Sequence, residues 1–258
     1  MAERRLVDLW SVHLDSVPKS LSELLCSEER SRALGLPAGT VRSRWRACRA
    51  VLRLLLSGRL RVDPQSLRFE LGAHGKPRLV SAAEHFNISH SGPLALYAFC
   101  ADAEVGVDVE LISASSRRRN EVAIASRLFG QEAARRLASL PERERSLEFL
   151  SQWVRHEAVV KCIGCGIGHA LDELRSEDLP SVLDVELDSA LAAVAVASSA
   201  AEVRMHEWTV QRAEGDEVSA EPGLTGARVA SLGLGRELPH SGVSCLTRAR
   251  AADLVRCI

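Results

Sequence analysis

Residues 105 to 112 read VGVDVELI, and this stretch constrains the fold more than any other part of the chain. Valine and leucine alternate with Asp108 and Glu110, which is the period-2 pattern of a half-buried β-strand. Both carboxylates leave the same face of that strand with Cα atoms about 6.6 Å apart, so both side chains can reach one small ion. The alternative is the solvated face of an edge strand, where acidic side chains only discourage aggregation.

Composition limits the class of protein. The chain has 258 residues, 46% hydrophobic and 26% charged, which fits a globular protein with a real core. A formal charge of −1 gives no global field for nucleic acid or anionic membrane, so we expect neither partner. Seven cysteines spread along the chain do not indicate a disulfide framework. The sequence has no signal-peptide pattern and no apolar run long enough to span a bilayer, which predicts a cytoplasmic protein.

The order of predicted elements indicates an α+β fold. Each half has helices followed by a small antiparallel sheet, which predicts two similar α+β halves, residues 1–112 and 113–258. Helices are expected at 20–34, 40–60 and 120–163. Strands are expected at 6–14, 67–71, 94–100, 105–112, 182–187, 191–198, 205–213 and 227–234, with two more flanking FNISHSG at 86–92.

A helix near 149–163 carries a candidate partner for the acidic strand. Glu157 and Lys161 are four residues apart and share one helical face. The alternative is an ordinary surface salt bridge. Against it, Lys161 is one of only three lysines among 33 basic residues. Converging carboxylates of Asp108, Glu110 and Glu157 would disfavour one another's charge unless a cation lay between them, and Mg²⁺ is the natural candidate.

Two further stretches could bind phosphate. In GAHGKPRL, Lys76 presents a point charge beside Pro77, which stiffens the turn. In FNISHSG, Ser89, His90 and Ser91 place hydroxyls and an imidazole at a strand end. An ordinary polar turn and a partly buried histidine are the alternatives.

The motifs together are more specific than any one of them. GKP at 75–77, FNISHSG at 86–92, GVDVE at 106–110 and WxxxEAxxK at 153–161 occur in this order, followed by GCGI. This series resembles the 4′-phosphopantetheinyl transferases of the surfactin-synthetase-activating type. The resemblance runs from about Arg42 to Ile167 and implies the pseudo-twofold arrangement of two α+β halves known for that family, a pseudo-dimer within one monomeric chain.

The resemblance also implies an activity. Such enzymes move the phosphopantetheine arm of coenzyme A to a serine of an apo acyl or peptidyl carrier protein and release 3′,5′-adenosine bisphosphate. Their carrier proteins belong to polyketide, nonribosomal peptide or fatty acid synthesis.

Carried over motif by motif, the resemblance assigns roles to individual residues. Asp108, Glu110 and Glu157 would hold Mg²⁺ against the coenzyme A pyrophosphate. Glu157 would also help to deprotonate the serine, and Lys161 would stabilise or protonate the leaving phosphate. The expected coenzyme A contacts are Lys76 and His90 at phosphates, Ser89 nearby, Pro77 beside the adenine, and Arg46 or Arg49 at the 3′-phosphate.

Three points stay open at this stage. His156 stands where the family usually has lysine; it keeps a donor and titrates near pH 6.5. The arginines at 117–119, with Arg127, could meet an acidic carrier helix or simply be solvated. A metal-dependent nuclease and a non-catalytic module that binds coenzyme A or carrier proteins are the alternatives to a transferase.

Overall fold

The computed structural model describes residues 4–80, 84–112, 120–165 and 179–208, with the backbone of two short strands at 222–223 and 229–230. It is an α+β protein, as predicted. The helices are α1 Ser27–Leu34, α2 Thr40–Leu60, α3 Glu121–Leu128, α4 Gly130–Ala138 and α5 Glu142–Ile163, with 3₁₀ turns at Leu14–Ser16 and Lys19–Leu24. The strands are β1 Arg5–His13, β2 Phe69–Leu71, β3 Pro77–Leu79, β4 His85–Ser91, β5 Leu94–Cys100, β6 Val105–Leu111, β7 Ser181–Leu187, β8 Ala190–Val196, β9 Ala201–Trp208, β10 Pro222–Gly223 and β11 Val229–Ala230.

Two sheets form the centre of the molecule. One has the strand order β10-β9-β1-β5-β4, the other has the order β11-β7-β8-β6, and β2 and β3 form a separate pair. Each sheet combines strands from before and after residue 112. β6 pairs antiparallel with β8, whereas β9 runs parallel to β1. A division at residue 112 therefore does not separate the two sheets, and the pseudo-twofold relation stays a prediction.

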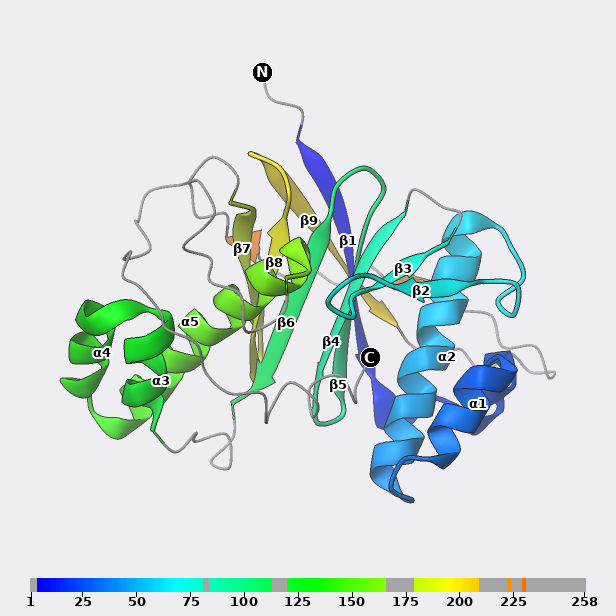
Figure 1. The fold of residues 1–258 in the computed structure, drawn as a ribbon, viewed down its shortest axis with the longest axis horizontal. Helices are drawn as coiled ribbons and strands as arrows, with labels where there is room; N and C mark the ends of the chain where they lie inside the picture. The colour runs from blue at the N-terminus through cyan, green and yellow to red at the C-terminus, as the bar shows by residue number, and fades with distance from the viewer. Residues whose placement is uncertain are drawn as a thin grey trace.

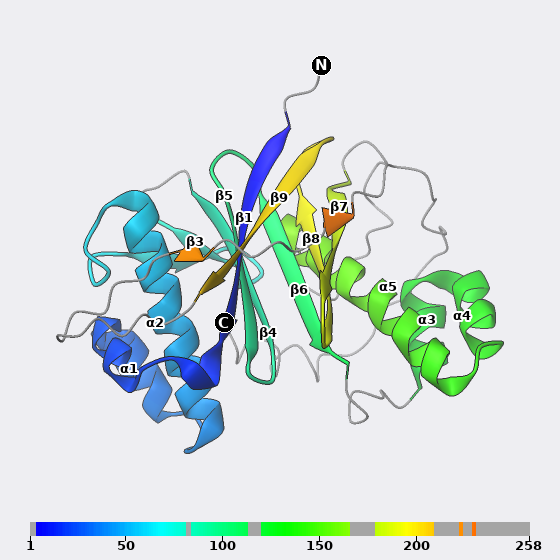
Figure 2. The same ribbon diagram turned by 180° about the vertical axis from the view of Figure 1, so that it is seen from behind.

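The hydrophobic cores show how these layers stack. Alternate residues of β5 face opposite ways: Tyr97 and Phe99 pack with α2, while Leu96 and Ala98 pack toward β6, β7 and β8. Small residues on the outer face of β8 pack against α5. Helix, sheet, sheet and helix thus form four layers, with α1 and α2 on one side of the strands and α3–α5 on the other (Figures 1 and 2).

Several predicted elements need correction. The stretch FNISHSG, expected to lie between two strands, lies largely within a strand itself, β4, with β3 before it and β5 after it. The helix expected at 20–34 is a 3₁₀ turn followed by α1, where the Glu29 carboxylate accepts a hydrogen bond from the Cys26 backbone N–H as part of a capping box. The long helical region expected at 120–163 consists of three helices, separated where Gly130 has φ 85° and where Pro141 precedes α5. The predicted strand at 205–213 begins earlier, at Ala201, and parts of the last two predicted strands lie outside the described residues.

Candidate active site

Strands β4 and β6 are edges of different sheets, and side chains join them. Alternate N–H groups of an edge strand point away from its sheet and need acceptors. The N–H of Val107 donates to Asn87 Oδ1 at 2.9 Å, and the N–H of Val109 donates to Ser89 Oγ at 3.3 Å. The N–H of Leu111 donates to Ser91 Oγ at 3.2 Å. We call this row of contacts the β4–β6 seam.

The same seam orients the two carboxylates of β6. The Ser89 hydroxyl donates to Asp108 Oδ1 at 2.8 Å, and the Ser91 hydroxyl donates to Glu110 Oε2 at 3.1 Å. Asp108 is buried, with 6% of its surface exposed. Each serine thus accepts from a backbone N–H and donates to a carboxylate, which fixes both groups at once. The solvated-edge alternative for Asp108 is wrong.

Helix α5 brings Lys161 to this seam. Its ammonium donates to Asp108 Oδ1 at 2.6 Å and to Ser89 Oγ at 3.1 Å. Glu157, one turn earlier, is buried with 3% exposure. A solvated surface salt bridge between Glu157 and Lys161 is therefore excluded as the explanation of their spacing.

A glycine makes this approach of α5 to β6 possible. A Cβ at Gly106 would lie 2.1 Å from the carbonyl oxygen of Ala158 and 2.3 Å from the backbone nitrogen of Cys162. Real side chains essentially never come so close to backbone atoms. The glycine of GVDVE therefore sets the spacing between the strand that carries Asp108 and the helix that carries Lys161.

The three predicted metal ligands do not form a ready-made cluster. Among the described residues, no three His, Cys, Asp or Glu side chains are placed to hold one ion. Asp108 accepts a hydrogen bond from Lys161 and Glu110 accepts one from Ser91, so the assignment of Asp108, Glu110 and Glu157 as ligands of one ion stays a prediction. The donor set itself, carboxylates with neighbouring hydroxyls, still has the chemistry that Mg²⁺ prefers.

Of the expected coenzyme A contacts, Lys76 is already engaged with the protein. It is buried with 8% exposure, and its ammonium donates to Glu104 Oε2 at 2.6 Å. It also donates to the carbonyl oxygens of Val105 and Cys162, each at 3.0 Å. Pro77 is buried beside it and lines a small hollow of about 120 Å³.

The other predicted phosphate contacts differ in access. His90 is half-buried, and its pKa is lowered by burial and by the charges of Lys161 and Arg44. Arg46 is exposed on α2. Arg49 is 8% exposed and donates to Glu29 Oε1 at 2.9 and 3.0 Å. Arg46 is thus the more accessible of the two candidate arginines.

The structure corrects the expected chemistry of His156. Its half-buried ring packs edge-on against Phe129, with centroids 5.6 Å apart. Burial lowers the pKa of His156 to about 4, so the imidazole is neutral at pH 7 rather than titrating near its usual value. It provides packing at the position where the resemblance led us to expect a charged lysine. The arginines at 117–119 lie outside the described residues.

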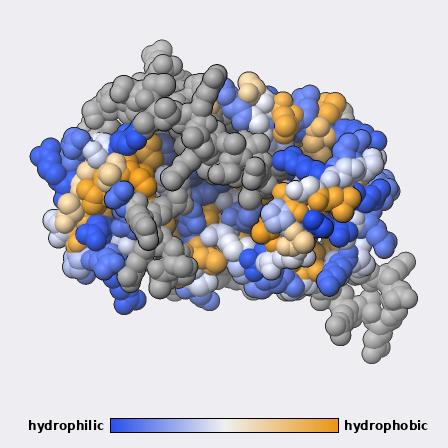
Figure 3. Space-filling model, turned by 60° about the horizontal axis from the view of Figure 1, so that its bottom comes forward, coloured by the Kyte–Doolittle hydropathy of each residue, from blue (hydrophilic) through white to orange (hydrophobic). Residues whose placement is uncertain are grey.

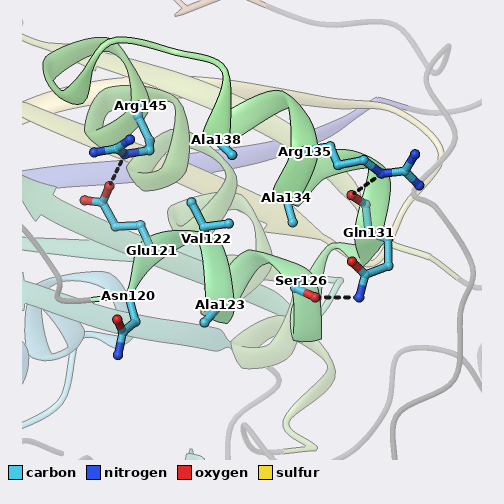
Figure 4. Close-up of a pocket in the computed structure, with 10 residues that line it drawn as sticks. All are labelled: Asn120, Glu121, Val122, Ala123, Ser126, Gln131, Ala134, Arg135, Ala138 and Arg145. Carbon is cyan, nitrogen blue, oxygen red and sulfur yellow. Dashed lines mark hydrogen bonds and ion pairs between the residues drawn. The ribbon is translucent and has the colours of Figure 1, made fainter.

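A larger hollow lies away from these residues. It is an open hollow of about 550 Å³ lined by residues of α3 and α4 and by Arg145 of α5 (Figure 4). Arg145 faces the buried Glu121 at one end, and Gln131 hydrogen-bonds Ser126 at the other. None of the predicted site residues lines it. On the face seen in Figure 3, hydrophobic residues gather over the two outer lobes and hydrophilic ones lie between them.

Sequence reasoning missed part of the seam. Asn87 and Glu104 were not singled out, and Ser91 was expected only as a hydroxyl near phosphate, not as a partner of Glu110. The polar residues of F-N-I-S-H-S alternate with period 2, which was the available signal that they share one face of a strand. Which edge they face depends on how the two sheets pack, and the sequence pattern does not contain that.

The buried Asp108, its partly exposed partner Lys161 and the buried Glu157 one helical turn from Lys161 include the acid and base groups that enzyme active sites use. The family model described as the 4′-phosphopantetheinyl transferase superfamily matches residues 104–213. The 4′-phosphopantetheinyl transferase HetI of Nostoc sp. is 32% identical over 211 residues, 74% of this chain and 87% of the relative. The 4′-phosphopantetheinyl transferases ffp and Sfp of Bacillus subtilis are 31% and 29% identical over 123 residues, 47% of this chain and 52% of each relative.

The chain belongs to the 4′-phosphopantetheinyl transferase superfamily, and it is a transferase. The resemblance drawn from the ordered motifs is thereby confirmed. Over the described residues, no helix is long and apolar enough to cross a membrane.

Proposed function

We propose that this enzyme transfers 4′-phosphopantetheine from coenzyme A to a serine of an apo acyl or peptidyl carrier protein, with Mg²⁺, and releases 3′,5′-adenosine bisphosphate. The carrier would belong to a polyketide, nonribosomal peptide or fatty acid synthase. The observation that carries this proposal is the junction of Ser89, Asp108 and Lys161, which joins three of the family's motifs within hydrogen-bonding distance. Membership of the family favours this reaction over the nuclease alternative.

Residues at and near the junction could supply the base, the acid and the metal ligands of such a transfer. Glu157 is buried one helical turn from Lys161 and would act as base toward the serine hydroxyl. Lys161 would donate to the phosphate oxygen that leaves with the adenosine bisphosphate. Mg²⁺ held by Asp108, Glu110 and Glu157 would neutralise charge on the pyrophosphate oxygens.

Coenzyme A would bind across β4 and the GKP turn. His90 and the exposed Arg46 would contact its phosphates, and Pro77 would pack beside the adenine. Ser89 hydrogen-bonds Asp108 and Lys161, so its role would be to orient these two side chains. Arg49 would contribute to the 3′-phosphate only by leaving Glu29, which makes Arg46 the stronger candidate.

The carrier protein would approach the strand end at Ile112. We propose that the arginines at 117–119, with Arg127 on α3, attract its acidic surface. The enzyme would act as a cytoplasmic monomer. Charge reversal at 117–119 that left the carrier KM unchanged at low salt would remove the role of this patch.

The decisive assay measures the mass of an apo carrier protein after incubation with coenzyme A and Mg²⁺. Gain of one phosphopantetheine group is expected, with loss of the gain in EDTA and recovery on adding Mg²⁺. Asp108→Ala should abolish the gain, and Asp188→Ala, the same change at an exposed turn, should preserve it. No gain with several apo carriers would refute the proposal, and coenzyme A binding without transfer would indicate a non-catalytic module.

A further inference from the structure

Lys76 is held in a tight turn that points its side chain inward. Gly75 has φ 87°, and its N–H donates to the carbonyl of Gly72, whose own N–H donates to the carbonyl of Lys76. The ammonium reaches three acceptors, Glu104 Oε2 at 2.6 Å and the carbonyls of Val105 and Cys162 at 3.0 Å. An ammonium has three N–H donors, so all three have a protein acceptor.

One of those acceptors belongs to the last turn of the helix that carries Lys161. The carbonyl of Cys162 is among the last four of α5, which have no partner within the helix. A cation there also opposes the negative end of the helix dipole. Gly164, the C-cap with φ 73°, leaves room for the lysine stem, since its Cβ would lie 3.3 Å from Lys76 Cδ.

The other two acceptors lie where β6 begins. Glu104 and Val105 directly precede the strand positions that lead to Asp108. Lys76 keeps the pKa of Glu104 low against burial, which alone would raise it. The Cys162 thiol donates to the carbonyl of Glu104 at 3.2 Å and makes a second tie between the same two segments.

The geometry explains why this residue is a lysine in a chain that otherwise uses arginine. The chain has three lysines among 33 basic residues. A compact ammonium can donate to a carboxylate and two carbonyls that converge from separate segments. The planar fork of a guanidinium suits paired oxygens in one plane and needs more room.

We propose that Lys76 is a positioning residue that locks the end of α5 against the start of β6 and so holds Lys161 at Asp108. This role rests on the proposed transfer reaction and differs from direct contact with a coenzyme A phosphate. We call the contacts of Lys76 with Glu104, Val105 and Cys162 the Lys76 clamp. Lys161 directly precedes Cys162, and Asp108 lies three residues after Val105. A displacement of either segment at the Lys76 clamp therefore moves Lys161 or Asp108 with it. A phosphate contact would instead require the ammonium to leave its three acceptors.

The test compares Lys76→Met and Lys76→Arg with Lys19→Met, the same change at an exposed lysine. For both Lys76 variants we expect kcat to fall at least tenfold, a dissociation constant for coenzyme A within about threefold of wild type, and a lower midpoint of urea unfolding. Glu104→Gln should lower the midpoint in wild type but hardly at all in Lys76→Met. Lys19→Met should match wild type in every measurement.

Phosphate contact predicts a different pattern. A tenfold weaker affinity for coenzyme A in Lys76→Met, restored by Lys76→Arg, with additive effects of Glu104→Gln on unfolding, would overturn the positioning role. If Lys76→Met does not fold, Glu104→Gln alone must lower kcat while coenzyme A affinity is kept. If no carrier accepts phosphopantetheine, the proposed transfer reaction is refuted. The unfolding comparison and the coenzyme A affinities then still test the positioning role of Lys76.

Discussion

Replacing Gly106 by alanine tests the packing that brings together the segments of Asp108 and Lys161. The new Cβ would lie 2.1 Å from the carbonyl oxygen of Ala158, and contacts below 3.0 Å essentially never occur, so β6 and α5 must separate by about 0.9 Å. Both neighbours are backbone atoms and cannot rotate away. The 2.6 Å bond from Lys161 to Asp108 spans the same two elements and must lengthen with them.

Two measurable consequences follow for Gly106→Ala. Overpacking of this kind costs about 2–3 kcal/mol of unfolding free energy. A displacement near 1 Å at catalytic groups lowers rate by on the order of 100-fold. Urea denaturation gives the first quantity, and the rate of mass gain of a carrier protein at saturating coenzyme A gives the second.

Gly58→Ala is the matched control, because it makes the same change where nothing lies within 4 Å of the new Cβ. Gly58 is exposed within α2, and alanine there should stabilise the protein by about 0.5–1 kcal/mol without changing kcat. If Gly106→Ala were as stable and as active as wild type, the tight β6–α5 contact would not set the geometry of the site.

Two further predictions concern buried polar groups. Burial raises the pKa of Glu29, but its bonds to Arg53 and Arg49 outweigh burial and leave the pKa below 4.5. The stabilisation of the folded state by ionised Glu29 is therefore present above pH 4.5 and is lost as the pH falls through the lower folded-state pKa. The unfolding free energy should therefore fall as the pH drops below 4.5. Glu29→Gln should cost about 3 kcal/mol at pH 7 and should flatten that slope. Asn87→Ala leaves the buried N–H of Val107 without its acceptor and should cost about 1–3 kcal/mol in urea denaturation, against little change for a substitution on the exposed face of α2. An unchanged pH slope in the first variant, or an unchanged urea midpoint in the second, would contradict these assignments.

The sequence predicted the elements whose pattern is local. The alternation in β6 placed Asp108 and Glu110 on one face, and the spacing of Glu157 and Lys161 placed both on one face of α5, because period 2 and period 3.6 belong to the backbone itself. It did not predict that β4 is a strand through FNISHS, since Asn87 and Ser89 disfavour strands on propensity and are there for contacts across the seam. Nor did it predict that His156 is neutral, because burial against Phe129 is a tertiary effect.

The position of the seam explains why the site needs segments that lie far apart in the sequence. Asp108 belongs by sequence to the first part of the protein, but its strand completes the sheet built by β7 and β8. Its hydroxyl donor comes from β4, an edge of the other sheet, and its ammonium donor comes from α5. A slip of one residue in either sheet would turn Asp108 or Ser89 to the opposite face and break the junction. The junction of Ser89, Asp108 and Lys161 therefore requires both sheets to pack in register, so the geometry of the candidate site depends on the packing of the two layers.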